Sequence, residues 1–113
     1  MRTTILALGW IAVLMGIIHI LFVFPINEFR LGHMWFIGSG IAILFAGIIN
    51  LLGQTSQKNK TSFILVLFAN FIMCFLFIVG TMVLHEPQVY FGIVLFAALA
   101  VLTVLMKRSS TSL

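Results

Sequence analysis

The chain contains very little charge. It has 2 acidic residues and 6 lysines or arginines, so only 7% of its 113 residues are charged. Soluble domains are about a quarter charged. A soluble chain this short could not hide a composition that is 63% hydrophobic, because small domains keep much of their surface in water. The shortage of charge excludes an ordinary soluble domain and indicates that lipid surrounds most of the chain.

Cysteine and the common catalytic motifs are also scarce. The single cysteine, Cys74, lies within a hydrophobic run, and one cysteine forms neither an intrachain disulfide nor a cysteine-based metal cluster. No P-loop, Rossmann fingerprint, GxSxG or CxxC motif occurs. The net charge is +4, but the cations sit near breaks and chain ends and form no basic face, which excludes nucleic acid as a partner.

Long apolar runs dominate what remains. Four of them cover residues 3–24, 31–52, 62–84 and 88–106. As helices they measure roughly 28 to 35 Å, enough to cross the hydrocarbon core, and their continuity argues against a barrel. The first run is too long for a cleaved signal peptide, so we expect it to be retained. The sequence predicts one all-α integral membrane domain over residues 1–113, a four-transmembrane-helix antiparallel bundle.

Turn residues punctuate the runs. Pro25 blocks continuation of the first helix, and Gly53 suits the position just after the second helix. Pro87 suits the first position of the fourth helix, and the third helix is expected to end just before it. This tight break predicts that the third and fourth helices are antiparallel neighbours.

The distribution of cations predicts the orientation in the membrane. Arg2, Lys58, Lys60, Lys107 and Arg108 fall on one side of the expected topology, and Arg30 falls on the other. Cytoplasmic loops of membrane proteins carry an excess of lysine and arginine. Both termini and the middle loop are therefore expected in the cytoplasm, and the bacterial inner membrane is the expected location.

Small and amide residues suggest how the helices pack. Helices approach closely in lipid where small residues meet, and a mid-span asparagine often joins two helices. Asn50, in contrast, is read as a helix-end residue. The predicted packing residues are Gly9, Ala12, Gly16, Gly38, Gly40, Ala42, Ala46, Gly47 and Asn70. They predict that the first two helices make the closest contact.

The histidines and acids are the remaining candidates for chemistry. His19 lies about 7 to 8 Å inside the first span, and its helix face continues the small residues before it. His33, His85, Glu28 and Glu86 are all expected in the same outer leaflet. Imidazole and carboxylate groups suit divalent metals or proton transfer, although interfacial histidine and glutamate are also inexpensive to place. The sequence predicts an outer pocket that His19 shares with at least one of the other four.

Several functions remain open from the sequence. One is a non-enzymatic accessory protein or a binder of hydrophobic ligands, which requires only the features above. Its expected partner is membrane lipid, and it is expected to form a homo-oligomer or part of a larger membrane complex. A His-ligated haem b or divalent-metal site is an alternative. A small proton-linked transporter that uses His19 is another, although no acid lies within a span. A membrane enzyme with histidine and glutamate as acid and base is the least favoured.

Overall fold

The computed structural model describes residues 1–24, 28–55 and 59–111. Within these ranges the chain forms four α-helices and no strand. They are α1 (Arg2–Leu21), α2 (Leu31–Thr55), α3 (Lys60–Gly80) and α4 (Pro87–Thr111). The predicted turn at Pro25 and the cation Lys58 lie outside the described residues. The expectation of an all-helical chain is confirmed for the part that the structure describes.

All four helices are long and apolar enough to cross a membrane. Their outer surfaces carry large hydrophobic side chains, among them Trp10 on α1, Phe45 on α2, Phe75 on α3 and Val94 on α4. Such a surface has no favourable partner in water but matches the hydrocarbon of a bilayer. The structure is therefore consistent with an integral membrane protein.

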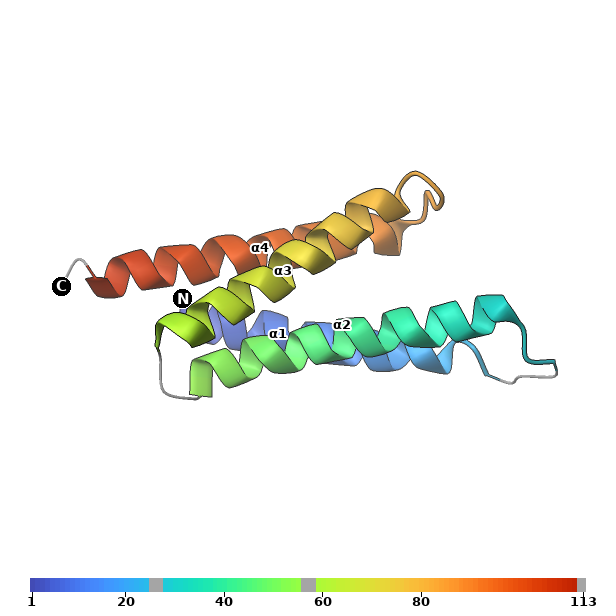
Figure 1. The fold of residues 1–113 in the computed structure, drawn as a ribbon, viewed down its shortest axis with the longest axis horizontal. Coiled ribbons are helices and arrows are strands. Elements are labelled where there is room, and N and C mark those ends of the chain that lie inside the picture. Colours follow the sequence, from blue (N-terminus) through green and yellow to red (C-terminus); the bar gives the residue numbers. More distant parts are fainter. Residues whose placement is uncertain (25–27, 56–58, 112–113) are drawn as a thin grey trace.

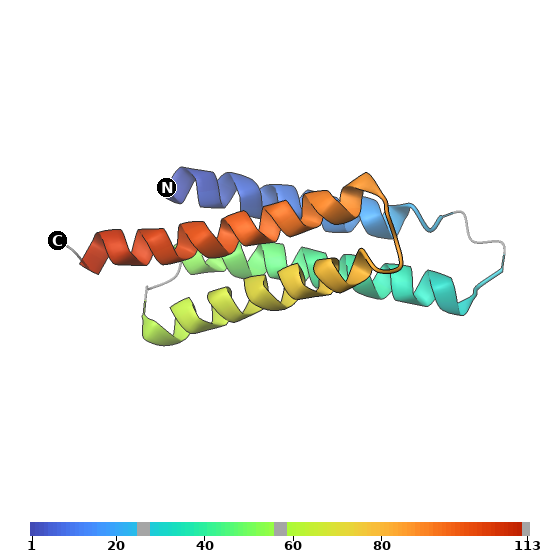
Figure 2. The ribbon, with the colours of Figure 1, turned by 90° about the horizontal axis from the view of Figure 1, so that it is seen from above.

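The helices are arranged as two pairs in two layers. In Figure 1, α1 and α2 lie side by side in one layer, and α3 and α4 lie in the other. The chain reverses direction between consecutive helices, as the view from above in Figure 2 also shows. Met1, the end of α2, the start of α3 and the end of α4 lie at one end, here called the terminal end. The opposite end is called the hairpin end, and the two layers diverge toward it.

Glycines bring α1 and α2 into backbone contact. A Cβ atom built on Gly16 would lie 2.6 Å from the main-chain nitrogen of Leu44 and 2.7 Å from the carbonyl oxygen of Gly40. One built on Gly47 would lie 2.8 Å from the main-chain nitrogen of Val13 and 3.0 Å from the carbonyl oxygen of Gly9. Only hydrogen fits at such distances. Gly9, Gly16, Gly40 and Gly47 therefore form the seam between these helices, and this pair makes the most extensive contact in the fold.

The small residues Gly38, Ala42 and Ala46, which repeat every four positions in the sequence, do not form the seam with α1. Gly38 is exposed, and a Cβ atom built on it would meet nothing within 4 Å. Ala46 instead lies in the central core with Ala12, and Ala42 packs against that core. The prediction for Gly38 is wrong because residues 38 and 40 lie about 200° apart around a helix. The face of α2 that meets α1 carries Gly40.

A central core joins the two layers. It contains Ile5 and Ala12 from α1, Ile43 and Ala46 from α2, Met73 from α3, and Leu95, Phe96 and Leu99 from α4. The helices α3 and α4 approach each other at Gly92, which has no side chain and so leaves room for the Phe77 ring. The Phe77 and Phe96 rings then stack with centroids 5.9 Å apart.

All four helices end at positions that differ from the sequence prediction, since α1 ends at Leu21 and not at residue 24, and α4 continues past residue 106 to Thr111. The helix α3 ends at Gly80 and not at Leu84. There the Thr81 hydroxyl donates to the Ile78 carbonyl at 2.6 Å, and the chain continues as a turn through Leu84. The helix α2 continues through Gly53 to Thr55. Gly53 is therefore an interior position, where it faces Val66 of α3.

Candidate ligand-binding site

His19 is paired with α2. Its Nε2 atom lies 3.0 Å from the Ser39 hydroxyl, and its ring stacks on Phe36 with centroids 3.9 Å apart and planes within 4°. The Ser39 hydroxyl also donates to the Phe36 carbonyl at 3.0 Å. Both α2 residues that His19 contacts therefore belong to the same helical turn. This half-buried group joins α1 to α2 near the hairpin end, and Ser39 is a partner that the sequence prediction did not include.

The other four predicted site residues make local contacts or none within the described part of the chain. Glu28 forms an exposed salt bridge with Arg30 at 3.3 Å, and the His33 Nδ1 atom accepts from the Arg30 main-chain nitrogen at 3.1 Å. Glu86 accepts from Gln88 at 3.1 Å, and His85 is exposed. Across the described ranges, no group of three His, Cys, Asp or Glu side chains could hold a metal ion. The structure does not join these residues to His19 in a shared metal site.

A buried pair of amides connects α2 to α3. Asn50 Nδ2 donates to Asn70 Oδ1 at 2.8 Å, and Asn70 Nδ2 donates to Asn50 Oδ1 at 2.9 Å. Both residues are 0% exposed, and Asn50 Nδ2 also donates to the Ala46 carbonyl at 2.8 Å. Asn70 thus makes the interhelical bond that a mid-span asparagine favours. The interpretation of Asn50 as a helix-end residue is wrong, because α2 continues for more than another turn.

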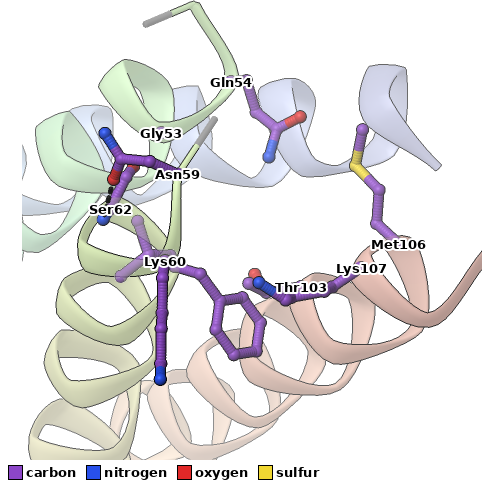
Figure 3. A pocket seen from close by; sticks show the side chains of 10 residues that line it. Gly53, Gln54, Asn59, Lys60, Ser62, Thr103, Met106 and Lys107 are labelled. Carbon is purple, nitrogen blue, oxygen red and sulfur yellow. Dashed lines mark hydrogen bonds between the residues drawn. The ribbon is translucent and has the colours of Figure 1, made fainter. Parts of the chain in front are cut away.

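A partly polar pocket of about 300 Å³ opens at the terminal end, between the end of α2, the start of α3 and the last turns of α4 (Figure 3). Amide, hydroxyl and ammonium groups line it, from Gln54, Asn59, Lys60, Ser62, Thr103 and Lys107. Its apolar part is formed by Phe63, Val66 and Met106. Asn59 caps α3 by accepting from the Ser62 main-chain nitrogen at 2.7 Å. This cap fixes the rim of the pocket.

Gln54 supplies the pocket with an unsatisfied buried acceptor. The residue is 9% exposed, and its Oε1 atom has no hydrogen-bond partner among the described residues. Its side chain projects from the last turn of α2 toward Thr103 and Met106 of α4 (Figure 3). Buried polar atoms without partners are rare and costly. A ligand that donates a hydrogen bond would satisfy this one.

An apolar groove of about 640 Å³ continues from the pocket along α2 and α3. The two hollows share Gly53, Asn59, Ser62 and Val66 as lining residues. From there the groove runs between Ala42, Ala46 and Ile49 of α2 and Ala69, Ile72 and Met73 of α3. The pocket and the groove together are called the slot below. Its polar part lies at the terminal end, and its apolar part reaches the middle of the helices.

No protein-family model, curated protein or solved structure matches this chain. The site is therefore interpreted from its own geometry.

Sequence reasoning missed the residues that shape this site. Gln54, Thr103 and Lys107 lie on two helices that are far apart in the sequence, and only the fold brings them together. One signal was available, because Asn50 and Gln54 are four residues apart and so share a helix face. Two amides on one apolar helix face indicate a polar layer at that end of the bundle.

Proposed function

We propose that this chain is a non-enzymatic integral membrane protein that binds one phospholipid in the slot. The four helices form an antiparallel bundle in the bacterial inner membrane, with both termini in the cytoplasm. The lipid comes from the cytoplasmic leaflet, its headgroup occupies the terminal pocket, and an acyl chain follows the groove between α2 and α3.

One observation carries the proposal, which is the continuity of the polar pocket with the apolar groove through Gly53 and Val66. A phospholipid has the same order of chemistry, a polar head followed by an apolar chain. In a bilayer the groove alone gives little preference for one lipid, because the surrounding chains are equally apolar. The polar contacts of the head therefore supply the affinity, and the groove supplies the fit.

The charge distribution supports the orientation. The cations of the terminal end include Arg2, Lys60, Lys107 and Arg108, whereas Arg30 at the hairpin end is paired with Glu28. Basic residues favour the cytoplasmic side, where anionic lipids attract each lysine or arginine by about 1 kcal/mol. The polar groups of the pocket are amides, hydroxyls and ammonium groups, which are suited to holding a phosphate and its substituents.

The test fills the groove without touching the pocket. Ala69 lines only the apolar part, so the variant Ala69→Trp should place an indole where the acyl chain lies. The matched control is Ala7→Trp, which adds the same bulk at an exposed position on α1. Phospholipid that remains with the protein after purification in mild detergent is quantified by mass spectrometry.

The expected result is retained lipid in the wild type and in Ala7→Trp, with a several-fold loss in Ala69→Trp. Equal retention by all three proteins would show that lipid binds elsewhere, and the absence of retained lipid from the wild type would also count against the proposal. Circular dichroism establishes that each variant keeps its helices.

A further inference from the structure

We infer that the slot selects an anionic phospholipid whose headgroup bears hydroxyl groups, as phosphatidylglycerol does. This inference rests on the proposed function and names the lipid class that the pocket prefers. Two sides of the pocket support it separately, one suited to the phosphate and the other to a hydroxyl donor.

The phosphate side lies at the start of α3. The first main-chain N–H groups of a helix attract anions, but in α3 the Ser62 N–H donates to the Asn59 side chain and the Phe63 N–H to the Asn59 carbonyl, which leaves only the earlier N–H groups of the first turn for a ligand. Lys60 lies at this rim, and Lys107 of α4 lines the same pocket. These groups together favour an anionic phosphate.

Opposing charge at this end is small. The last carbonyl groups of α2 would repel an anion, but the Arg2 guanidinium donates to the Gln54 carbonyl at 3.4 Å and offsets their dipole. The two acids of the sequence, Glu28 and Glu86, both belong to the hairpin end. Neither acidic side chain of the sequence therefore lies at the terminal end.

The hydroxyl side consists of acceptors on α2 and α4. Gln54 Oε1 is buried and has no partner in the described part of the chain. The Thr103 hydroxyl donates its proton to the Leu99 carbonyl at 2.7 Å, so toward the pocket it can only accept. A headgroup beside these atoms is favoured when it donates hydrogen bonds, which glycerol hydroxyls do and a fully ionised phosphate does not.

Other common headgroups fit less well. An ethanolamine ammonium can donate to Gln54, but it adds positive charge beside Lys60 and Lys107. A choline cation needs an aromatic face. The Phe63 ring already carries the Lys107 ammonium 4.5 Å from its centroid. The pocket therefore favours a neutral, hydroxylated substituent on the phosphate.

The experiment measures binding of short-chain phospholipids to the full-length protein in detergent by native mass spectrometry. The lipids are phosphatidylglycerol, phosphatidic acid, phosphatidylethanolamine and phosphatidylcholine with identical acyl chains. Phosphatidylglycerol should bind about fivefold to tenfold more tightly than phosphatidic acid, the size expected for one or two good hydrogen bonds to a buried acceptor. Glycerol 3-phosphate, which has the head chemistry without the chains, should bind far more weakly than either.

Two variants separate the sides of the pocket. Gln54→Met keeps the length of the side chain and removes its acceptor, so it should abolish the preference for phosphatidylglycerol over phosphatidic acid. Lys60→Gln combined with Lys107→Gln should weaken binding of both lipids about equally. Arg30→Gln changes charge at the hairpin end and should leave both affinities unchanged, as should Ala7→Trp.

The outcomes separate this inference from the proposed function. Equal affinity for all four lipids, or an unchanged preference in Gln54→Met, would overturn the inference and leave phospholipid binding in place. Tighter binding of phosphatidylethanolamine would also overturn it. Failure of every lipid to bind, or equal binding of glycerol 3-phosphate, would overturn the proposed function itself.

Discussion

Asn50 and Asn70 satisfy each other's hydrogen-bonding groups in a layer where hydrocarbon offers no replacement. Their reciprocal bonds of 2.8 and 2.9 Å fix α3 against α2. Residues on either side of this pair, including Ala46, Gly53, Val66 and Met73, line the groove. The amide pair therefore sets the width of the groove, which makes it a positioning feature for the site.

Replacement of either asparagine by leucine should lower the free energy of unfolding by about 1 to 2 kcal/mol, because the remaining amide loses its partner in a dry environment. The double variant Asn50→Leu/Asn70→Leu should lose less than the sum of the single losses, since neither amide is then left unpaired. Thermal or denaturant unfolding in detergent measures all three. Strictly additive losses would contradict a direct bond between the two side chains.

The contacts of single side chains were the features that the sequence predicted least well. The burial of His19 and its need for a partner follow from its place in an apolar span. Its actual partner, Ser39, depends on the rotation of α2 about its axis, which composition does not determine. The role of Gln54 was not predicted for a related reason. The helix α2 continues past Gly53, so a residue expected in a loop lies within the bundle.

The pairing of α1 with α2 depends on glycine at positions seven residues apart on each helix. Gly9 faces Gly47, and Gly16 faces Gly40. This spacing places one small residue on the same face every two turns, so the backbones approach along most of their length. The contact makes this hairpin the more extensively packed of the two layers, against which α3 and α4 pack through the central core.

Gly16→Ala should reduce the free energy of unfolding by about 1 to 3 kcal/mol, because the added methyl meets the backbone of α2, which cannot move aside as a side chain would. Gly38→Ala is the matched control on α2. Its methyl meets open space, so the variant should be neutral or gain up to about 1 kcal/mol from helix propensity. Equal effects of the two substitutions would show that the seam is wrongly placed.

The helices themselves were largely predictable from sequence, since uninterrupted apolar runs leave few alternatives in lipid. The positions of the helix ends were less predictable. The turn bonds after Gly80 and the extension of α2 to Thr55 depend on a side-chain bond and on packing against α3. The seven-residue glycine repeat was visible in the sequence. The four-residue repeat at Gly38 competed with it, and only the helix rotation distinguishes them.

The whole molecule consists of two helical hairpins that meet most closely near the terminal end. This arrangement explains why the polar pocket forms there, where α2, α3 and α4 end or begin together. It also places the site at the opposite end from the His and Glu residues that the sequence favoured. Except for His19, which packs against α2, those residues lie in or beside the connections, where polar side chains face water at little cost.

Tags at both termini should be accessible only from the cytoplasm, and a tag inserted between His85 and Glu86 only from the opposite side. The reason is the excess of lysine and arginine at the terminal end. Protease protection in intact spheroplasts, compared with lysed cells, measures this directly. A terminal tag that is cleaved in intact spheroplasts would reverse the orientation and place the slot in the outer leaflet.

The central claim is that a phospholipid chain lies between α2 and α3 with its head at the terminal end. Photo-crosslinking with a phosphatidylglycerol that carries a diazirine in one acyl chain tests it most directly, with labelled peptides mapped by mass spectrometry. Labelling should concentrate on residues 42–52 and 65–73 and should fall sharply in Ala69→Trp. Labelling spread evenly over the exposed faces of all four helices, unchanged by that substitution, would contradict the account.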